Sequence, residues 1–217
     1  MPNAKTAKPQ SSDILNEMFG TFCLKVFDAK QAAKNKDAER DFKAVHKSLS
    51  NHIKASLERD DIFSFFESSK EIIYLMAAMA DEAFLNTEWS GRKYWEDNML
   101  EQLYFGTQIA GDKIFERISA LFTEKDPLSA EKAGIYLRAL CLGFAGRYRG
   151  IEDGEAEIKD NKKRLSEFIE KADPSVFLVG NRLFPKEYSY TIPARSRKFL
   201  PDPSIISYVC AFFIFMF

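Results

Sequence analysis

One segment, Ile72–Ala80 (IIYLMAAMA), constrains the fold more than any other part of this 217-residue chain. It carries no charge and is apolar nearly all round when it is read as a helix. Such a helix is stable in water only when other elements surround it. We therefore expect it in the middle of the fold, with Ala77, Ala78 and Ala80 letting neighbouring helices approach closely.

Helical periodicity dominates the chain on both sides of this segment, and no convincing strand alternation occurs before Pro174. Apolar residues recur at helical spacing, and candidate N-caps or breakers such as Asp126-Pro127 separate the periodic stretches. The predicted class is all-α. Besides the central segment, we expect helices at about 13–34, 42–57, 94–104, 111–122, 127–144 and 155–171.

The composition bounds the function. Hydrophobic residues make up 46% and charged residues 29%, as in ordinary folded domains. The 31 basic residues nearly balance the 32 acidic ones, which argues against a nucleic-acid partner because phosphate binding needs a concentrated cationic surface. Residues 1–12 are polar without an apolar core, so they read as a disordered leader and not as a secretory signal.

The end of the sequence is an uncharged apolar run, Ile205–Phe217 (IISYVCAFFIFMF). Residues 13–173 form the helical domain by this reading, and the proline-containing stretch 174–203 is an extended connector. The run has 13 residues, enough for about 20 Å of a bilayer core about 30 Å thick. A C-terminal core helix is the alternative, but Arg195, Arg197 and Lys198 just upstream fit the cytosolic flank of a span. We expect residues 204–217 to be a membrane anchor cut short by the chain end, with bilayer contacts from Ile205, Ile206, Val209, Phe212, Phe213, Ile214, Phe215 and Phe217.

Recognisable catalytic machinery is absent from the sequence. Phosphate-binding, dinucleotide-binding, zinc-protease and nucleophile-elbow motifs do not occur. His46 and His52 lie about 120° apart around one predicted helix, so they cannot share a metal as an i, i+4 pair would. We expect no metal, no cofactor and no enzymatic activity.

Asp81 and Glu82 are the acids that follow the central apolar helix directly, and three readings of them stay open. One could be a catalytic acid whose pKa is raised by burial. They could form buried ion pairs with arginines downstream, or they could be an acidic docking surface. The candidate arginines are Arg138, Arg147 and Arg149.

A glycine-punctuated basic segment, Gly143–Gly150 (GFAGRYRG), allows two readings. It could cradle a phosphate, although it lacks the lysine-hydroxyl ending of phosphate-binding loops. We favour a helix end followed by a tight turn whose arginines pair with acids.

Several of these segments, taken together, resemble one known family. The hallmarks are an alanine-rich helix ending in Asp-Glu-Ala, a Trp-containing loop, a Phe-Gly-Thr element with a following glycine, and Leu-Gly-Phe-x-Gly-Arg-Tyr. All four occur in order, and the sequence is similar to the DotU/TssL family, also called IcmH, from about Asp13 to Phe184 and in its apolar tail. The blocks are Ala77–Trp95, Leu103–Ile118 and Tyr136–Gly150.

The resemblance implies a hook-like cytosolic domain of two small three-helix bundles, tethered to the bacterial inner membrane by one C-terminal span. It also implies a scaffold of a type VI or type IVB secretion system that links an IcmF/TssM-like inner-membrane protein to cytosolic baseplate or secretion components. A homodimer is a further expectation. The implied partner-binding residues are Asp81, Glu82, Glu88 and Trp89, and the structural motif residues are Trp95, Phe105, Gly106, Gly111, Gly143, Phe144, Gly146, Arg147 and Tyr148. The alternative is an unrelated tail-anchored helical adaptor.

Deletion of Ile205–Phe217 tests the reading of the tail. If the run is an anchor, the shortened chain should be soluble and folded, because the core of the domain would not depend on it. Fractionation and a melting curve measure this. Loss of folding on deletion would instead make the run a core helix.

Overall fold

The computed structural model describes residues 11–34, 42–124 and 126–172. These residues form helices and no strand, which confirms the predicted all-α class. The predicted leader overlaps the first helix by two residues, and the rest of it, the connector at 174–203 and the anchor residues of 204–217 lie outside the described residues. The elements are α1 (Ser11–Lys34), α2 (Phe42–Leu57), the 3-10 helix η1 (Asp60–Phe65), α3 (Phe66–Leu85), α4 (Arg92–Asp97), α5 (Leu100–Phe105), α6 (Ala110–Leu121), α7 (Ser129–Cys141), the 3-10 helix η2 (Gly146–Tyr148) and α8 (Gly154–Ala172).

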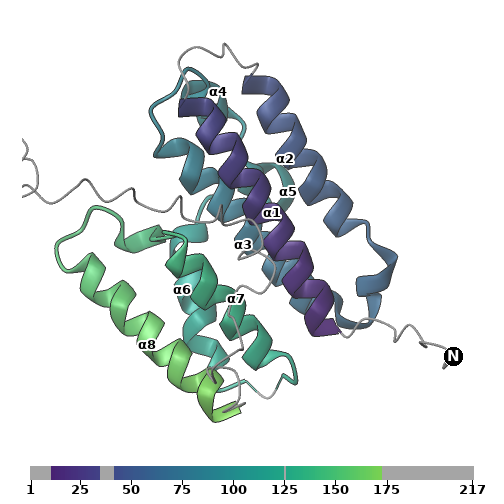
Figure 1. Cartoon of the computed structure of the whole chain (residues 1–217), viewed down its shortest axis with the longest axis vertical. Coiled ribbons are helices and arrows are strands. Elements are labelled where there is room, and N and C mark those ends of the chain that lie inside the picture. The colour runs from purple at the N-terminus through teal and green to yellow at the C-terminus, as the bar shows by residue number, and fades with distance from the viewer. Residues whose placement is uncertain (1–10, 35–41, 125, 173–217) are drawn as a thin grey trace, which may run out of the picture. The chain divides into compact units, whose positions relative to one another are not determined.

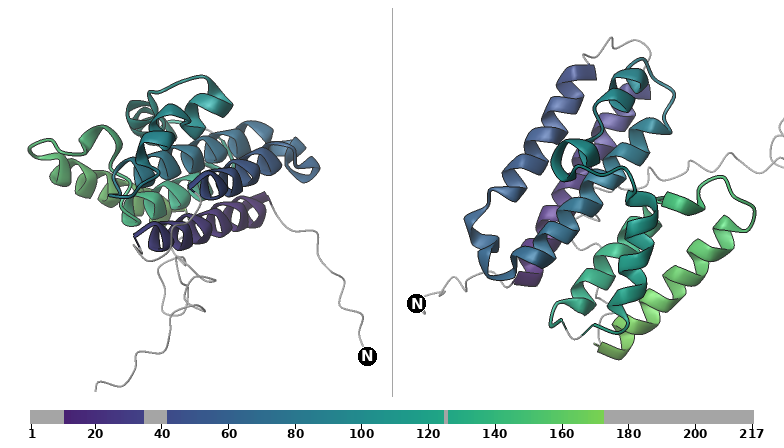
Figure 2. Two further views of the ribbon diagram at one scale, coloured as in Figure 1. Left: turned by 90° about the horizontal axis from the view of Figure 1, so that it is seen from above. Right: turned by 180° about the vertical axis from the view of Figure 1, so that it is seen from behind.

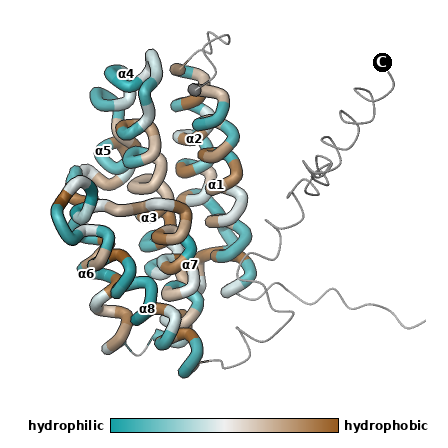
Figure 3. The backbone as a smooth tube through the Cα atoms, turned by 60° about the vertical axis from the view of Figure 1, so that its left-hand side comes forward, coloured by the Kyte–Doolittle hydropathy of each residue, from teal (hydrophilic) through white to brown (hydrophobic). Residues whose placement is uncertain are grey.

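The central apolar segment lies where its sequence predicts. It forms the middle of α3, and all of its residues are buried except the half-buried Met79. Six other α-helices, α1, α2, α4, α5, α6 and α7, contact α3, so its apolar surface is covered from several sides (Figures 1 and 3). The helix is longer than the apolar run, because it begins at Phe66 and continues to Leu85.

The remaining long helices are arranged in two groups. Helices α1 and α2 pack on each other and on α3, while α8 packs on α7 and α7 on α6 (Figures 1 and 2). The buried side chains of both groups nevertheless form one hydrophobic core cluster. The short helices α4 and α5 connect α3 to the second group along the chain.

Two helix boundaries differ from the expectation. The single aromatic helix expected at 94–104 is two helices, broken at Asn98 and Met99, because the backbone N–H groups that follow the break bind a side chain of α3 (described below). Helix α7 begins at Ser129, two residues beyond Pro127, since Asp126 Oδ1 accepts the N–H of Leu128 at 2.9 Å. Among the described helices, none is both long and apolar enough to cross a membrane.

A buried ionic network holds the two helix groups together. Lys132 on α7 is buried, and its Nζ lies 2.9 Å from Asp126 and 3.2 Å from both Glu71 and Glu124. Arg117 on α6 also binds Glu71 of α3, at 2.8 Å. Burial lowers the pKa of Lys132, but its contacts with Asp126 and Glu71 outweigh burial and leave the pKa raised, so the ammonium stays charged.

Removal of the Lys132 charge should therefore destabilise the fold. We expect Lys132→Met to lower the free energy of unfolding by about 3 kcal/mol, because three carboxylates lose a shared cation at a poorly solvated position. Urea denaturation measures it. The matched control is Lys163→Met on α8, an exposed lysine 3.9 Å from Glu167, which should change stability by less than about 0.5 kcal/mol. Equal effects of the two substitutions would contradict the role given to the network.

A candidate interaction site at the end of the central helix

The carboxylate of Asp81 is buried at the C-terminal part of α3, with 5% of the residue exposed. Its Oδ1 accepts hydrogen bonds from Trp95 Nε1 at 2.7 Å and from the Leu100 N–H at 2.9 Å. Its Oδ2 accepts the Glu101 N–H at 2.8 Å. Asp81 therefore caps α5 from outside that helix, satisfying two of the N–H groups that every helix start leaves without an intrahelical partner.

Burial has the largest effect on the pKa of Asp81. It raises the pKa of this carboxyl to about 6, although the three hydrogen bonds favour the charged form and lower it. The neighbouring charge of Glu101 raises the pKa further. The group is thus largely ionised at neutral pH and takes up a proton in mildly acidic solution.

Glu101 is a second buried carboxylate and was not anticipated from the sequence. One of its oxygens, Oε1, accepts hydrogen bonds from the Tyr74 hydroxyl at 2.7 Å, the Thr107 hydroxyl at 2.8 Å and the Ile109 N–H at 2.8 Å. The residue thereby fixes the loop between α5 and α6 against the middle of α3. If residues 94–104 formed a single helix, Glu101 would be interpreted as an ordinary surface acid. Its buried role could be inferred only from the helix break at Asn98 and Met99.

Glu82 is the third carboxylate, and it binds the glycine-rich segment after α7. Its two oxygens accept the N–H groups of Ala145 and Gly146, each at 2.9 Å, and Arg149 forms a salt bridge with Oε1. Arg149 Nη2 also donates to the carbonyl of Gly143 at 2.9 Å. The backbone N–H groups that a phosphate cradle would need are therefore occupied by the chain's own carboxylate, which contradicts that reading.

Of the three arginines considered as partners for the acidic pair, one binds it. Arg149 meets Glu82, whereas Arg138 bonds to Asn16 of α1. Arg147 lies 3.9 Å from Asp112, with its guanidinium 5.6 Å from the ring centre of Phe115.

Two motif glycines allow the loop after α7 to lie against the start of α6. Gly146 has φ +49°, and a Cβ there would lie 2.9 Å from the carbonyl oxygen of Gly111. A Cβ on Gly111 would in turn lie 3.1 Å from the Arg147 nitrogen. Phe144 and Tyr148, on either side, both pack on Phe115, with ring centroids 6.2 and 4.6 Å away.

The tryptophan-containing loop after α3 is held against the end of that helix by contacts with Phe84. Trp95 is fully buried and stacks on Phe84, with ring centroids 4.3 Å apart. Trp89 is half-buried and donates its indole N–H to the Phe84 carbonyl at 3.1 Å. Glu88, directly before Trp89, is exposed. Of the four residues expected to bind partners, only Glu88 presents its charge freely to solvent.

The segments fixed by these acids also carry exposed apolar side chains. Leu103 and Ile109, around the α5–α6 loop, are each more than half exposed to solvent. The same holds for Leu142 and Ile151, around the segment after α7. Phe105, by contrast, packs edge-on against Tyr74 at 4.9 Å, and Gly106 ends α5 with φ +69°. The loops that the buried carboxylates bind therefore carry apolar side chains exposed to solvent.

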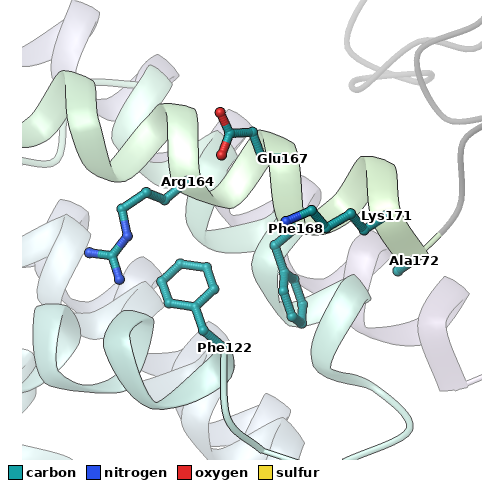
Figure 4. Close-up of a pocket in the computed structure, with 6 residues that line it drawn as sticks. All are labelled: Phe122, Arg164, Glu167, Phe168, Lys171 and Ala172. Carbon is teal, nitrogen blue, oxygen red and sulfur yellow. The ribbon is translucent and has the colours of Figure 1, made fainter.

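Metal ligands, histidines and cavities were the remaining candidates for a chemical site. They contain no group of three or more His, Cys, Asp or Glu that could hold a metal ion. His46 is buried, with Nε2 2.7 Å from the Asn98 carbonyl oxygen, and His52 is half-buried. An open groove of about 600 Å³ lies on α8 and the end of α6, and neither Asp81 nor Glu82 lines it; its residues are Phe122, Arg164, Glu167, Phe168, Lys171 and Ala172 (Figure 4).

Comparison with known proteins gives a consistent result. The family model described as type VI secretion system protein DotU matches residues 21–217. The crystal structure of TssL from Vibrio cholerae has a similar fold, with a TM-score of 0.64 at 19% identity, over 76% of this chain and 100% of that chain. The crystal structure of the T6SS protein SciP/TssL from enteroaggregative Escherichia coli 042 gives a TM-score of 0.56 at 26% identity, over 73% and 89%. A search of curated proteins finds no match.

The raised pKa of Asp81 predicts a pH dependence of stability. Because the folded pKa of about 6 exceeds the ordinary value of 3.8, only the folded state binds this proton between those values. The contribution of Asp81 to the free energy of unfolding should therefore rise by about 1 kcal/mol as pH falls from 7 to 5, and it is lost as pH rises through 6.

The Asp81→Asn variant checks this prediction, since it should lack that rise and should be less stable at both pH values. Urea denaturation at the two pH values gives the comparison, with the exposed Asp160→Asn as control. A wild-type curve and an Asp81→Asn curve with the same pH slope would contradict the assignment.

Proposed function

Because this chain belongs to the family of the type VI secretion system protein DotU, we propose that it is a non-enzymatic scaffold subunit of a bacterial type VI secretion system, held at the inner membrane. The family is that of a structural secretion-system component and not a known enzyme family. Membership also sets aside the alternative of an unrelated adaptor, and the description of the matching family favours type VI over type IVB.

The observation that carries the proposal is that three carboxylates bind backbone N–H groups of the domain itself. Asp81, Glu82 and Glu101 are committed to hydrogen bonds with backbone N–H groups of loops that follow α3. The described part of the chain contains no group of three or more His, Cys, Asp or Glu that could hold a metal ion. Their effect is to preorganise a surface, which lowers the entropic cost of binding another protein.

We assign the docking contacts to the loops rather than to the acidic pair itself. Asp81 and Glu82 shape the surface from beneath, while Glu88 and the exposed Ile109 and Leu142 would touch the partner. Apolar contacts supply affinity, and an exposed acid adds orientation and on-rate. The proposed partners are an IcmF/TssM-like inner-membrane protein and cytosolic baseplate components.

The membrane part of the proposal rests on the sequence. The uncharged run Ile205–Phe217 with Arg195, Arg197 and Lys198 before it supports a single-pass anchor with the helical domain in the cytoplasm. The lipid bilayer is then a partner of the tail, and partner proteins meet the domain on the cytosolic side. A homodimer stays a prediction.

Paired substitutions at outward and inward positions test the docking assignment. The Glu88→Lys, Ile109→Ser variant should keep its melting temperature within about 2 °C and lose capture of the IcmF/TssM-like protein or of a baseplate component by roughly tenfold. The control is Glu170→Lys on the exposed side of α8, which should change neither property. Co-purification and a secretion assay measure the outcomes.

Glu82→Gln separates shaping from contact. It removes the charge that pairs with Arg149 and binds the Ala145 and Gly146 N–H groups, so it should lower the melting temperature and partner capture together. A folded Glu88→Lys, Ile109→Ser variant with undiminished capture of every proposed partner would overturn the docking assignment.

A further inference from the structure

Phe63 is the most exposed of the large apolar side chains in the described residues, with 88% of its surface in water. Phe66, three positions later, is 40% exposed. Single exposed apolar residues are common, but two large aromatic rings kept in water on one short turn form a surface that binding can bury. Phe63 lies in η1, between α2 and α3, and Phe66 begins α3.

The turn beneath the two rings is firmly held. Ile62 is buried in the core, and Phe65 packs against it. The Ser69 hydroxyl donates to the Phe65 carbonyl at 3.1 Å. The rings are therefore presented by an ordered turn, so little backbone freedom has to be lost when they bind.

The surroundings of the rings are acidic. Asp60 and Glu67 are exposed, and the segment 58–67 (ERDDIFSFFE) contains four acids and one base. That base, Arg59, is used by Asp61, to which it donates two hydrogen bonds at 2.8 and 2.6 Å. The segment that carries the two rings thus has net negative charge.

We propose that Phe63 and Phe66 form an aromatic knob that inserts into an apolar pocket of a partner protein whose rim carries Lys or Arg. Charge complementarity selects this occupant: a bilayer with anionic lipids would repel Asp60 and Glu67. A second copy of the chain meeting knob to knob would also place like charges face to face. Aromatic side chains that fill a pocket are the usual source of binding energy in an interface.

The knob is separate from the loop surface described above. Phe63 lies in η1 and Phe66 is the first residue of α3, whereas Asp81 and Glu82 lie near the last, and a helix of 20 residues is about 30 Å long. Figure 1 shows α2 running from its start near α4 to the opposite end, where the chain turns back into α3. The inferred partner can therefore bind at the same time as the one assigned to the loops.

Site-specific crosslinking of the full-length chain in cells that assemble the secretion system tests the proposal. A photoreactive amino acid replaces the exposed Ser64, and mass spectrometry identifies the crosslinked peptide. We expect a peptide of another protein, from a surface where apolar residues adjoin Lys or Arg. Phe63→Ala should lower the yield roughly tenfold, and Asp60→Lys, Glu67→Lys should lower it as well.

The controls keep this test independent of the loop surface. Phe27→Ala, at a ring 59% exposed on α1, should leave the yield unchanged, and so should Glu88→Lys, Ile109→Ser. A melting curve for each variant checks folding. Crosslinks confined to lipid, to a second copy or to the chain itself would overturn the proposal, as would no crosslink or a yield indifferent to Phe63→Ala and to the charge reversal.

Discussion

The fold depends on the burial of a carboxylate at the end of its central helix. Asp81 accepts three N–H groups, two from the backbone at the start of α5 and one from Trp95, so it determines where the chain goes after it leaves α3. The burial is costly, since it raises the pKa of the group to about 6. An apolar residue would avoid that cost, but it would leave two buried helix-start N–H groups unsatisfied.

Glu82 and Glu101 extend the same principle to two further loops. Each carboxylate provides several acceptor positions, so one side chain satisfies backbone groups of an irregular segment that has no ladder or helix to satisfy them. The loops between α5 and α6 and after α7 are thereby fixed on one scaffold, α3. The carboxylates that the sequence suggests for partner docking form hydrogen bonds within the domain, so in our proposal the exposed loop residues make the contacts with a partner.

Much of this could be predicted from the sequence, because it depends on local patterns. The all-round apolarity of Ile72–Ala80 indicated the central helix, and the periodic stretches indicated most other helices close to their observed positions. The link between Asp81 and Trp95, and the role of Glu101, could not be predicted, since they depend on a helix break at Asn98 that has no glycine or proline to mark it. Periodicity reports which face of a helix is apolar, but it says nothing about which distant backbone groups a carboxylate will meet.

The spacing of these contacts along the chain has a consequence for the order in which the protein folds. The three partners of Asp81 lie 14 to 20 residues away, whereas the Ala145, Gly146 and Arg149 groups bound by Glu82 lie 63 to 67 residues away. Closing the shorter loops costs less chain entropy. Helices α3 to α5 can thus assemble as they leave the ribosome. The contacts of Glu82 with Ala145, Gly146 and Arg149 cannot form until α7 and the glycine-rich segment after it have been synthesised. The contacts of Glu82 therefore complete the loop after α7 only once Phe144 and Tyr148 of that segment are available to pack on Phe115.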